Sequence, residues 1–182
     1  MKQAVKVRSR LFIHASKGLI KPEHKVLDVG CGDGFMTTEF KNHFKCNIVG
    51  TDVINYLKTD IPFVPMPSST DLSFNDNEFD VVMIIDSLHN TRDDIHKKLL
   101  SECKRVGKTV LIFDTFPSFT SKLICFILSH ANEKNMDVPL NFKSNIYYIS
   151  MAKTMGFKHV EGLPIKKSFY YPMNHYGLLL TK

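Results

Sequence analysis

The strongest constraint on the fold is a strand-like apolar run that breaks into three glycines at alternate positions. Residues 26–29 read Val-Leu-Asp-Val, and Gly30, Gly32 and Gly34 follow before a segment of helical period begins. Glycine has no Cβ, so such a loop can adopt positive φ angles and lets another molecule approach the backbone. Amides at the turn and at the start of the helix offer hydrogen-bond donors. The pattern predicts a strand-to-helix turn, which either binds a ligand or only connects the two elements tightly.

The glycine spacing differs from that of the dinucleotide-binding fingerprint GxGxxG. Position 35, where the third glycine of that fingerprint would fall, is Phe35, so the sequence reads GxGxG. A second feature favours a ligand. Asp52 ends the next strand-like run, 18 residues after Gly34, where a carboxylate can accept two hydrogen bonds from a ribose diol. The alternative is that Asp52 caps a helix beginning at Val53.

Apolar runs of strand length alternate with segments of helical period, which predicts the α/β class and a mainly parallel sheet. Residues 67–77, rich in Ser, Asp and Asn, are expected to form a loop. We expect helices at 4–20, Phe35–Phe44, Asp93–Val106 and Ser144–Met155, and strands at Lys25–Val29, Asn47–Thr51, Phe63–Pro65, Phe79–Ile85 and Thr109–Phe113. The last 26 residues resemble a hairpin with strands Phe157–Pro164 and Phe169–Leu180.

Length and composition exclude several classes. The 182 residues fit one core, and 43% hydrophobic with 23% charged residues exclude a disordered, collagen-like or disulfide-dense chain. The longest apolar run, Leu123–Leu128, is six residues, whereas a membrane-spanning helix needs about 20. The four cysteines show neither a CxxC pair nor a histidine at metal-ligand spacing. We therefore expect no metal site, and a reducing cytoplasm fits best.

The net charge of +6 is concentrated at the beginning of the chain. Residues 1–25 hold seven Lys or Arg against Glu23 alone, while residues 26–182 hold 17 of each sign. A basic segment can favour phosphate-rich partners, but it more often forms a solvated helix face. His14 and Lys17 interrupt the early apolar stretch, which argues against a signal peptide. A mitochondrial transit peptide is the alternative, although the short connection 21–24 to the first strand favours a folded helix.

The motifs together resemble those of the class I S-adenosylmethionine-dependent methyltransferases, in particular their methyltransferase type 11-like branch. Residues 28–34 resemble the family's (D/E)xGxGxG motif, and Asp52 the acid that ends its second strand. Residues 72–80 resemble LPFxDxSFD, and residues 86–90 resemble the DVLHH-like end of the fourth strand. The resemblance implies a Rossmann-like three-layer α/β/α sandwich, with a seven-stranded mainly parallel sheet and a reversed C-terminal strand. Residues 1–182 would form a single methyltransferase domain, with 4–20 as its N-terminal helix.

The resemblance also implies S-adenosyl-L-methionine as cofactor and a set of residues around it. Asp28 would meet its amino group, directly or through water, or would only brace the loop. Ser68 stands where the family often has an adenine-binding acid, so Ser68 and Ser69, or else Asp71, would face the adenine. Asp86 would face the methionine portion or cap the next segment, and Cys31 would contribute backbone rather than thiol. The implied cofactor-binding set is Asp28, Gly30, Cys31, Gly32, Gly34, Asp52, Val53, Ser68, Ser69 and Asp86.

His89 is the candidate catalytic residue. Methyl transfer is an in-line displacement, for which the protein mainly aligns the reacting atoms and excludes water. A base is needed only where the acceptor atom carries a proton, and His89 would then act as a neutral imidazole with a pKa near 6.5 unless its surroundings shift it. The alternative is that His89 only packs. His175 with Tyr170, Tyr171 and Tyr176 would close the substrate pocket or belong to the core.

The expected function is methylation of a small molecule, with an apolar acceptor among the candidates. The alternatives are an RNA or protein methyltransferase and a non-catalytic cofactor-binding module. The chain lacks the (D/N)PP(Y/F) motif of amino-directed base methylation and the Pro-Cys pair of cytosine C5 chemistry, which argues against a nucleic-acid partner. The apolar segment 116–128 needs a cover, which could be the sheet with a hydrophobic substrate, a second subunit or a lipid surface. The oligomeric state stays open.

Overall fold

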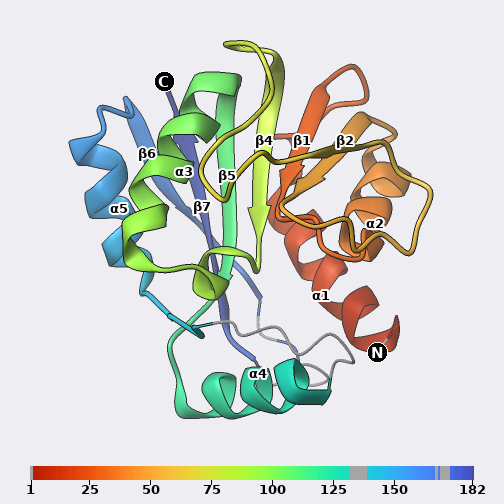
Figure 1. Cartoon of the computed structure of the whole chain (residues 1–182), viewed down its shortest axis with the longest axis vertical. Helices are drawn as coiled ribbons and strands as arrows, with labels where there is room; N and C mark the ends of the chain where they lie inside the picture. The colour runs from red at the N-terminus through yellow and green to blue at the C-terminus, as the bar shows by residue number, and fades with distance from the viewer. Residues whose placement is uncertain (1, 132–138, 167, 169–172) are drawn as a thin grey trace.

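The computed structural model describes residues 2–131, 139–166, 168 and 173–182. Its centre is a seven-stranded sheet with the order β3-β2-β1-β4-β5-β7-β6 (Figure 1). Strands β1 to β5 are parallel to one another, and β7 runs antiparallel to both β5 and β6. The mainly parallel sheet with a reversed last strand is thus confirmed. The strands are β1 (Lys25–Val29), β2 (Asn47–Asp52), β3 (Phe63–Pro65), β4 (Phe79–Ile85), β5 (Gly107–Thr115), β6 (His159–Leu163) and β7 (His175–Thr181).

Helices cover both faces of the sheet and produce the expected three layers (Figure 1). Helices α1 (Lys2–Ala15) and α2 (Phe35–Phe44) pack on one face, and α3 (Asp93–Val106) and α5 (Asn145–Thr154) on the other. Successive side chains of a strand point to opposite faces. Accordingly Val26 of β1 belongs to the core shared with α1 and α2, and Leu27 to the core shared with α3 and α5.

The parallel strands bring their carboxyl ends to one edge of the sheet. The end of β1 pairs with the ends of β2 and β4, through Val29↔Thr51 and Val29↔Ile84. The end of β4 pairs with β5 through Ile85↔Phe113. The segments that leave these strands therefore meet at this edge, which is where ligands bind in open α/β sheets. A short 3-10 helix, η1 (Leu88–Asn90), follows β4 there.

The first helix is shorter than the sequence predicts. Helix α1 ends at Ala15 instead of residue 20, and the chain turns through Gly18, whose φ is +82°. The Ser16 hydroxyl bonds to the Phe12 carbonyl at 2.9 Å and competes with continuation of the helix. Ile20 nevertheless stays buried in the same core as α1. The apolar spacing of residues 4–20 therefore indicates which side chains are buried, but it does not mark where the helix ends.

The end of the chain also differs in its boundaries. The last strand begins at His175, not at Phe169. Residues 167 and 169–172, between the two strands, lie outside the described part of the chain. Helix α4 (Phe119–Ala131) does not cover a face of the sheet but lies beyond the carboxyl edge of β5, at the bottom of Figure 1. Among the described residues, no helix combines the length and apolarity needed to cross a membrane.

Candidate functional site

A cavity of about 460 Å³ opens at the carboxyl edge of the sheet. It has two ends. The glycine-loop end is formed by residues 30–33 with Asp52 and Val53. The charged end is formed by Arg8, Asp86 and His89, which are contacted by two residues outside the lining, Asp114 and His175. The described lining residues are Arg8, Gly30, Cys31, Gly32, Asp33, Met36, Asp52, Val53, Tyr56, Ile85, Asp86, Ser87, His89, Asn90, Thr91, Thr115, Cys125, Leu140 and Met173.

The glycines at the glycine-loop end have different roles. Gly30 and Gly32 have φ angles of +75° and +55°, which L-residues rarely adopt. A Cβ at Gly30 would lie 2.1 Å from the Ser87 hydroxyl, so this glycine is needed for packing against the segment after β4. A Cβ at Gly32 would meet no described atom within 4 Å. Gly32 therefore exposes its backbone to open space on the cavity side. Gly34 does not belong to the described lining.

Asp52 ties the loop to the end of β2. One carboxylate oxygen accepts the Gly32 amide at 3.0 Å, and the other accepts the Val53 amide at 2.8 Å. Burial raises the pKa of this carboxyl, while the amides of Gly32 and Val53 counteract that effect. Residues 53–62 are all described and form no helix, so the alternative of a helix cap is wrong. Asp52 and Val53 both line the cavity.

Asp28 lies behind the loop and is almost completely buried. One of its carboxylate oxygens accepts the Thr37 hydroxyl at 2.6 Å, and the other has no hydrogen-bond partner among the described residues. Burial, supported by the nearby Asp52 charge and opposed by Thr37, raises the pKa of Asp28 to about 7. A buried oxygen of this kind is costly unless a donor reaches it. The unsatisfied oxygen fits a ligand that carries an amino group, although Asp28 is not part of the described lining.

The Cys31 side chain is buried against the strands, and its amide donates to the Thr51 carbonyl at 3.1 Å. Burial and the carboxylates of Asp28 and Asp52 raise the pKa of the Cys31 thiol. The thiol therefore remains protonated and unreactive at neutral pH. Cys31 therefore contributes its backbone to the cavity, and its side chain packs in the interior.

Ser68 and Ser69 stand apart from the other predicted site residues. The Ser68 hydroxyl bonds to Asp71 and lies 3.2 Å from the Thr70 hydroxyl, which closes a turn in the loop after β3. Neither serine lies among the described residues that line the cavity. The structure therefore does not bring them together with Asp52.

Asp86 follows β4 in a left-handed conformation, with φ of +49°. Arg8 of α1 lies 2.9 Å from one carboxylate oxygen, and His175 Nε2 lies 3.2 Å from the other. The Thr115 hydroxyl donates to that second oxygen at 3.2 Å. Burial would raise the pKa of Asp86, but the charge of Arg8 and then His175 hold it below its usual range. The side chain therefore forms an ion pair within the site rather than a helix cap.

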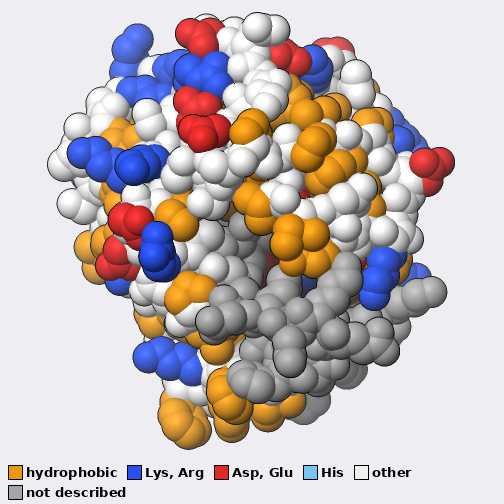
Figure 2. All heavy atoms as spheres, viewed as in Figure 1, with side chains coloured by type: hydrophobic (Ala, Val, Ile, Leu, Met, Phe, Trp, Pro, Cys, Tyr) orange, Lys and Arg blue, Asp and Glu red, His pale blue; other side chains and the backbone are white. Residues whose placement is uncertain are grey.

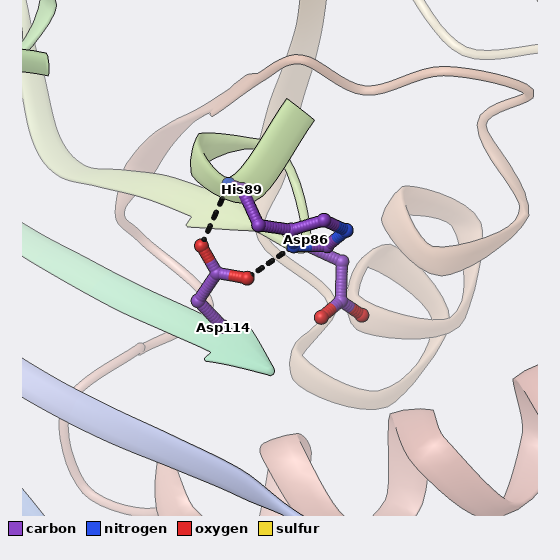
Figure 3. A group of neighbouring side chains, drawn as sticks. All are labelled: Asp86, His89 and Asp114. Carbon is purple, nitrogen blue, oxygen red and sulfur yellow. Dashed lines mark hydrogen bonds and ion pairs between the residues drawn. The ribbon is translucent and has the colours of Figure 1, made fainter. Parts of the chain in front are cut away.

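His89 is buried on η1 and held by Asp114 at two points (Figure 3). The backbone amide of His89 donates to one Asp114 oxygen at 3.1 Å, and Nδ1 of the ring contacts the other. The ring stacks on Phe142, with centroids 4.9 Å apart. Burial alone would lower the pKa of His89, but the Asp114 carboxylate and a bond with Cys125 raise it to about 10. The surroundings of His89 therefore shift its pKa away from the ordinary value near 6.5, and the imidazole is protonated at neutral pH.

Three groups of the charged end lie close enough to share a metal ion. Ligand atoms of Asp86, His89 and Asp114 are all within 4.8 Å of one another. Both carboxylates, however, already have cationic partners, Arg8 for Asp86 and His89 for Asp114. A divalent cation would have to displace the His89 proton and compete with Arg8. The ion pairs account for the cluster without a metal.

Sequence reasoning missed Arg8, Asp114 and Cys125, and it considered His175 only as a part of the pocket or core. Tyr176, the described tyrosine of that group, is buried in the core, and its hydroxyl donates to the Lys143 carbonyl at 3.2 Å. Tyr170 and Tyr171 lie outside the described residues. Asp114 could have been found from the sequence, because it directly follows the apolar run of the fifth expected strand. The ion pair between Arg8 and Asp86 could not, because it depends on the tertiary structure.

Comparisons with known proteins bear on the fold and the family of the chain. Residues 27–110 match the sequence profile of the methyltransferase domain family. A SAM-dependent methyltransferase from Archaeoglobus fulgidus is 19% identical, with a TM-score of 0.71 over 100% of this chain and 95% of that one. A Thermotoga maritima protein described as a possible histamine N-methyltransferase is 16% identical, with a TM-score of 0.69 over 99% and 92%. Haemonchus contortus phosphoethanolamine N-methyltransferase 2, solved with S-adenosyl-L-methionine, is 17% identical, with a TM-score of 0.69 over 96% and 52%. Among curated proteins, none matches the sequence.

The profile match over residues 27–110 and the fold together support a class I S-adenosylmethionine-dependent methyltransferase, an enzyme whose cofactor is S-adenosyl-L-methionine.

Proposed function

We propose that this enzyme transfers a methyl group from S-adenosyl-L-methionine to a small-molecule acceptor inside the cavity. The observation that carries the proposal is that one cavity joins two different ends, a glycine-loop end with exposed backbone beside the Asp52 carboxylate and a charged end with ion-paired side chains. When bound, the cofactor supplies an electrophilic methyl group on a sulfonium. The chain's own residues would hold that group in line with the acceptor and exclude water.

At the glycine-loop end, the Gly30, Cys31 and Gly32 backbone would contact the cofactor. Asp52 would accept hydrogen bonds from the ribose with the oxygen lone pairs that the amides leave unused. The unsatisfied Asp28 oxygen would receive the cofactor's amino group, directly or through water. Val53, which is half exposed beside Asp52, would offer an apolar surface. Gly34, Ser68 and Ser69 would act indirectly, by supporting the loops around the cofactor.

At the charged end, His89 would act as a hydrogen-bond donor rather than as a base. An imidazolium held by Asp114 cannot take up another proton, but it can bind an oxygen of the acceptor. Asp86, held by Arg8 and His175, would orient polar groups of the methionine portion. This arrangement favours acceptors whose reacting atom is already a free nucleophile, since His89 is not a neutral base below about pH 10.

The size of the cavity supports a small acceptor over an RNA or a protein. A volume of about 460 Å³ lies within the range of small-molecule sites, roughly 300 to 1,000 Å³. Two of the similar structures carry names that specify small amines, phosphoethanolamine and histamine.

We also propose that residues 1–182 form one domain and that the enzyme is cytoplasmic, since its four cysteines are free.

Calorimetry and turnover test the proposal in two stages. We expect S-adenosyl-L-methionine and its demethylated product to bind, and NAD and ATP not to bind. Release of S-adenosylhomocysteine across a panel of amines, carboxylates, lipids and tRNA then identifies the acceptor class. Comparable affinity for NAD would contradict the cofactor assignment. Turnover with tRNA alone would contradict the small-molecule acceptor, and cofactor binding without any turnover would favour a non-catalytic module.

A further inference from the structure

Helix α4 presents an apolar face to solvent. Phe119 is 81% exposed, and Leu123, Phe126 and Ile127 are each about half exposed. Their spacing of i, i+4, i+7 and i+8 places them on one side of the helix. Hydrophobic side chains gather at the lower end of the molecule in Figure 2, where Figure 1 shows α4. A surface helix normally shows solvent its polar side, so this orientation requires an apolar cover.

The opposite side of α4 faces the protein. Ser121 is fully buried, and Cys125 lines the cavity. The exposed stripe is therefore the outer surface of a helix whose inner surface borders the proposed site. Phe116, which precedes α4, is also partly exposed and extends the apolar surface.

The basic helix α1 borders the same cavity. Arg8 of α1 and Cys125 of α4 both line it. Lys6, Arg10 and Lys17, in α1 and the turn after it, are exposed. Neither helix contains an acidic residue in its sequence, and α4 adds Lys122. Arg10 and Lys17 also line a groove between α1 and α2, where Glu39 of α2 is the acidic residue in the described lining.

We infer that α4 docks on the surface of an anionic lipid bilayer. An apolar stripe with a flanking Lys is typical of helices that lie in the membrane interface. Basic residues nearby add attraction to anionic headgroups. The docked helix would place its stripe at the acyl boundary, with α1 against the headgroups and the cavity directly above.

Charge also distinguishes a bilayer from a second copy of the chain. A two-fold contact through α4 would bring the same patch of both copies together. The whole net charge of +6 resides in residues 1–25, so such a contact would draw two basic α1 segments toward each other. An anionic bilayer removes that repulsion and covers the same apolar surface.

Co-sedimentation with vesicles tests the inference without cofactor or turnover, so its outcome is independent of the proposed function. We expect binding to phosphatidylcholine vesicles with about 30% phosphatidylserine, and binding at least 10-fold weaker to pure phosphatidylcholine. Phe119→Ser/Ile127→Ser should reduce binding about 10-fold or more. The matched control is Ile146→Ser on α5, which is 71% exposed and lies outside the stripe.

The electrostatic contribution has its own pair of variants. Lys6→Gln/Arg10→Gln should weaken binding about 25-fold, at roughly fivefold per basic residue, whereas Lys97→Gln/Lys98→Gln on α3 should leave it unchanged. Circular dichroism confirms that each variant is folded. Equal binding by the stripe variant and the wild type overturns the inference, as does absence of vesicle binding by the wild type. A dimer in sedimentation velocity that Phe119→Ser/Ile127→Ser dissociates would assign α4 to a second copy instead.

Discussion

The two ends of the cavity are built in different ways. The glycine-loop end comes from segments that directly follow β1 and β2, and its key bonds join Asp52 to Gly32 and Val53. The charged end joins residues from four distant parts of the chain, and its bonds are ion pairs between side chains, such as Arg8 with Asp86. A backbone loop held by one carboxylate suits a constant ligand, whereas side-chain ion pairs can differ between enzymes on one fold. We therefore expect cofactor affinity to depend on the first end and acceptor chemistry on the second.

The largest expected effect is that of Asp52→Ala on cofactor binding. Charge-assisted hydrogen bonds are worth roughly 1.5 to 3 kcal/mol each, so the loss of a ribose contact should weaken binding about 100-fold or more. Calorimetry with S-adenosylhomocysteine measures the change, and Asp60→Ala, an exposed acid, is the matched control. If Asp52→Ala binds the cofactor normally but melts at a lower temperature, Asp52 stabilises the loop and does not bind the cofactor.

The charged end predicts a different kind of loss. His89→Gln should retain cofactor affinity and lose about 100-fold in turnover, as expected for removal of a preorganised donor. Since the pKa of His89 is about 10, wild-type activity should stay level from pH 7 to 9 and fall as pH rises through 10. An acid limb near pH 6.5 that vanishes in His89→Gln would restore the role of a neutral base. If affinity falls as much as turnover, the two ends are not separate.

Arg8→Gln should affect stability more than cofactor affinity. It leaves the Asp86 carboxylate with His175 and Thr115 as its contacting side chains among the described residues. Breaking one partner of a buried ion pair costs about 3 kcal/mol, and His175 should reduce the loss to about 2 kcal/mol. Urea denaturation measures it, with exposed Lys6→Gln as the control. Adding Asp86→Asn should recover part of the loss, because no unpaired charge then remains. Equal stabilities of wild type and Arg8→Gln would show that the pair is a surface contact.

The difference between the ends also explains what the sequence could predict. Strand and helix positions near the glycine loop agree with the structure, because Lys25–Val29 and Phe35–Phe44 have clear periods and local boundaries. The resemblance identified Asp52 and His89 as site residues, but not the charge on His89. That charge depends on Asp114, which lies 25 residues away in the sequence and contacts the ring only after β4 and β5 have paired. The basic segment containing Arg8 looked like a solvated face, since a sequence shows no tertiary partner.

The smallest expected effect is that of Ser68→Ala/Ser69→Ala on cofactor affinity. The Ser68 hydroxyl is already engaged by Asp71 and Thr70, so it is not free to bind adenine unless the turn opens. An exposed turn bond contributes about 1 kcal/mol or less, and any indirect change in affinity should stay below about threefold. Calorimetry of the double variant checks this, with Asp71→Ala as a companion that releases the turn. A loss of 10-fold or more in the serine variant would mean that the loop after β3 closes over the cofactor, and the glycine-loop end would then include a third segment that the structure holds apart.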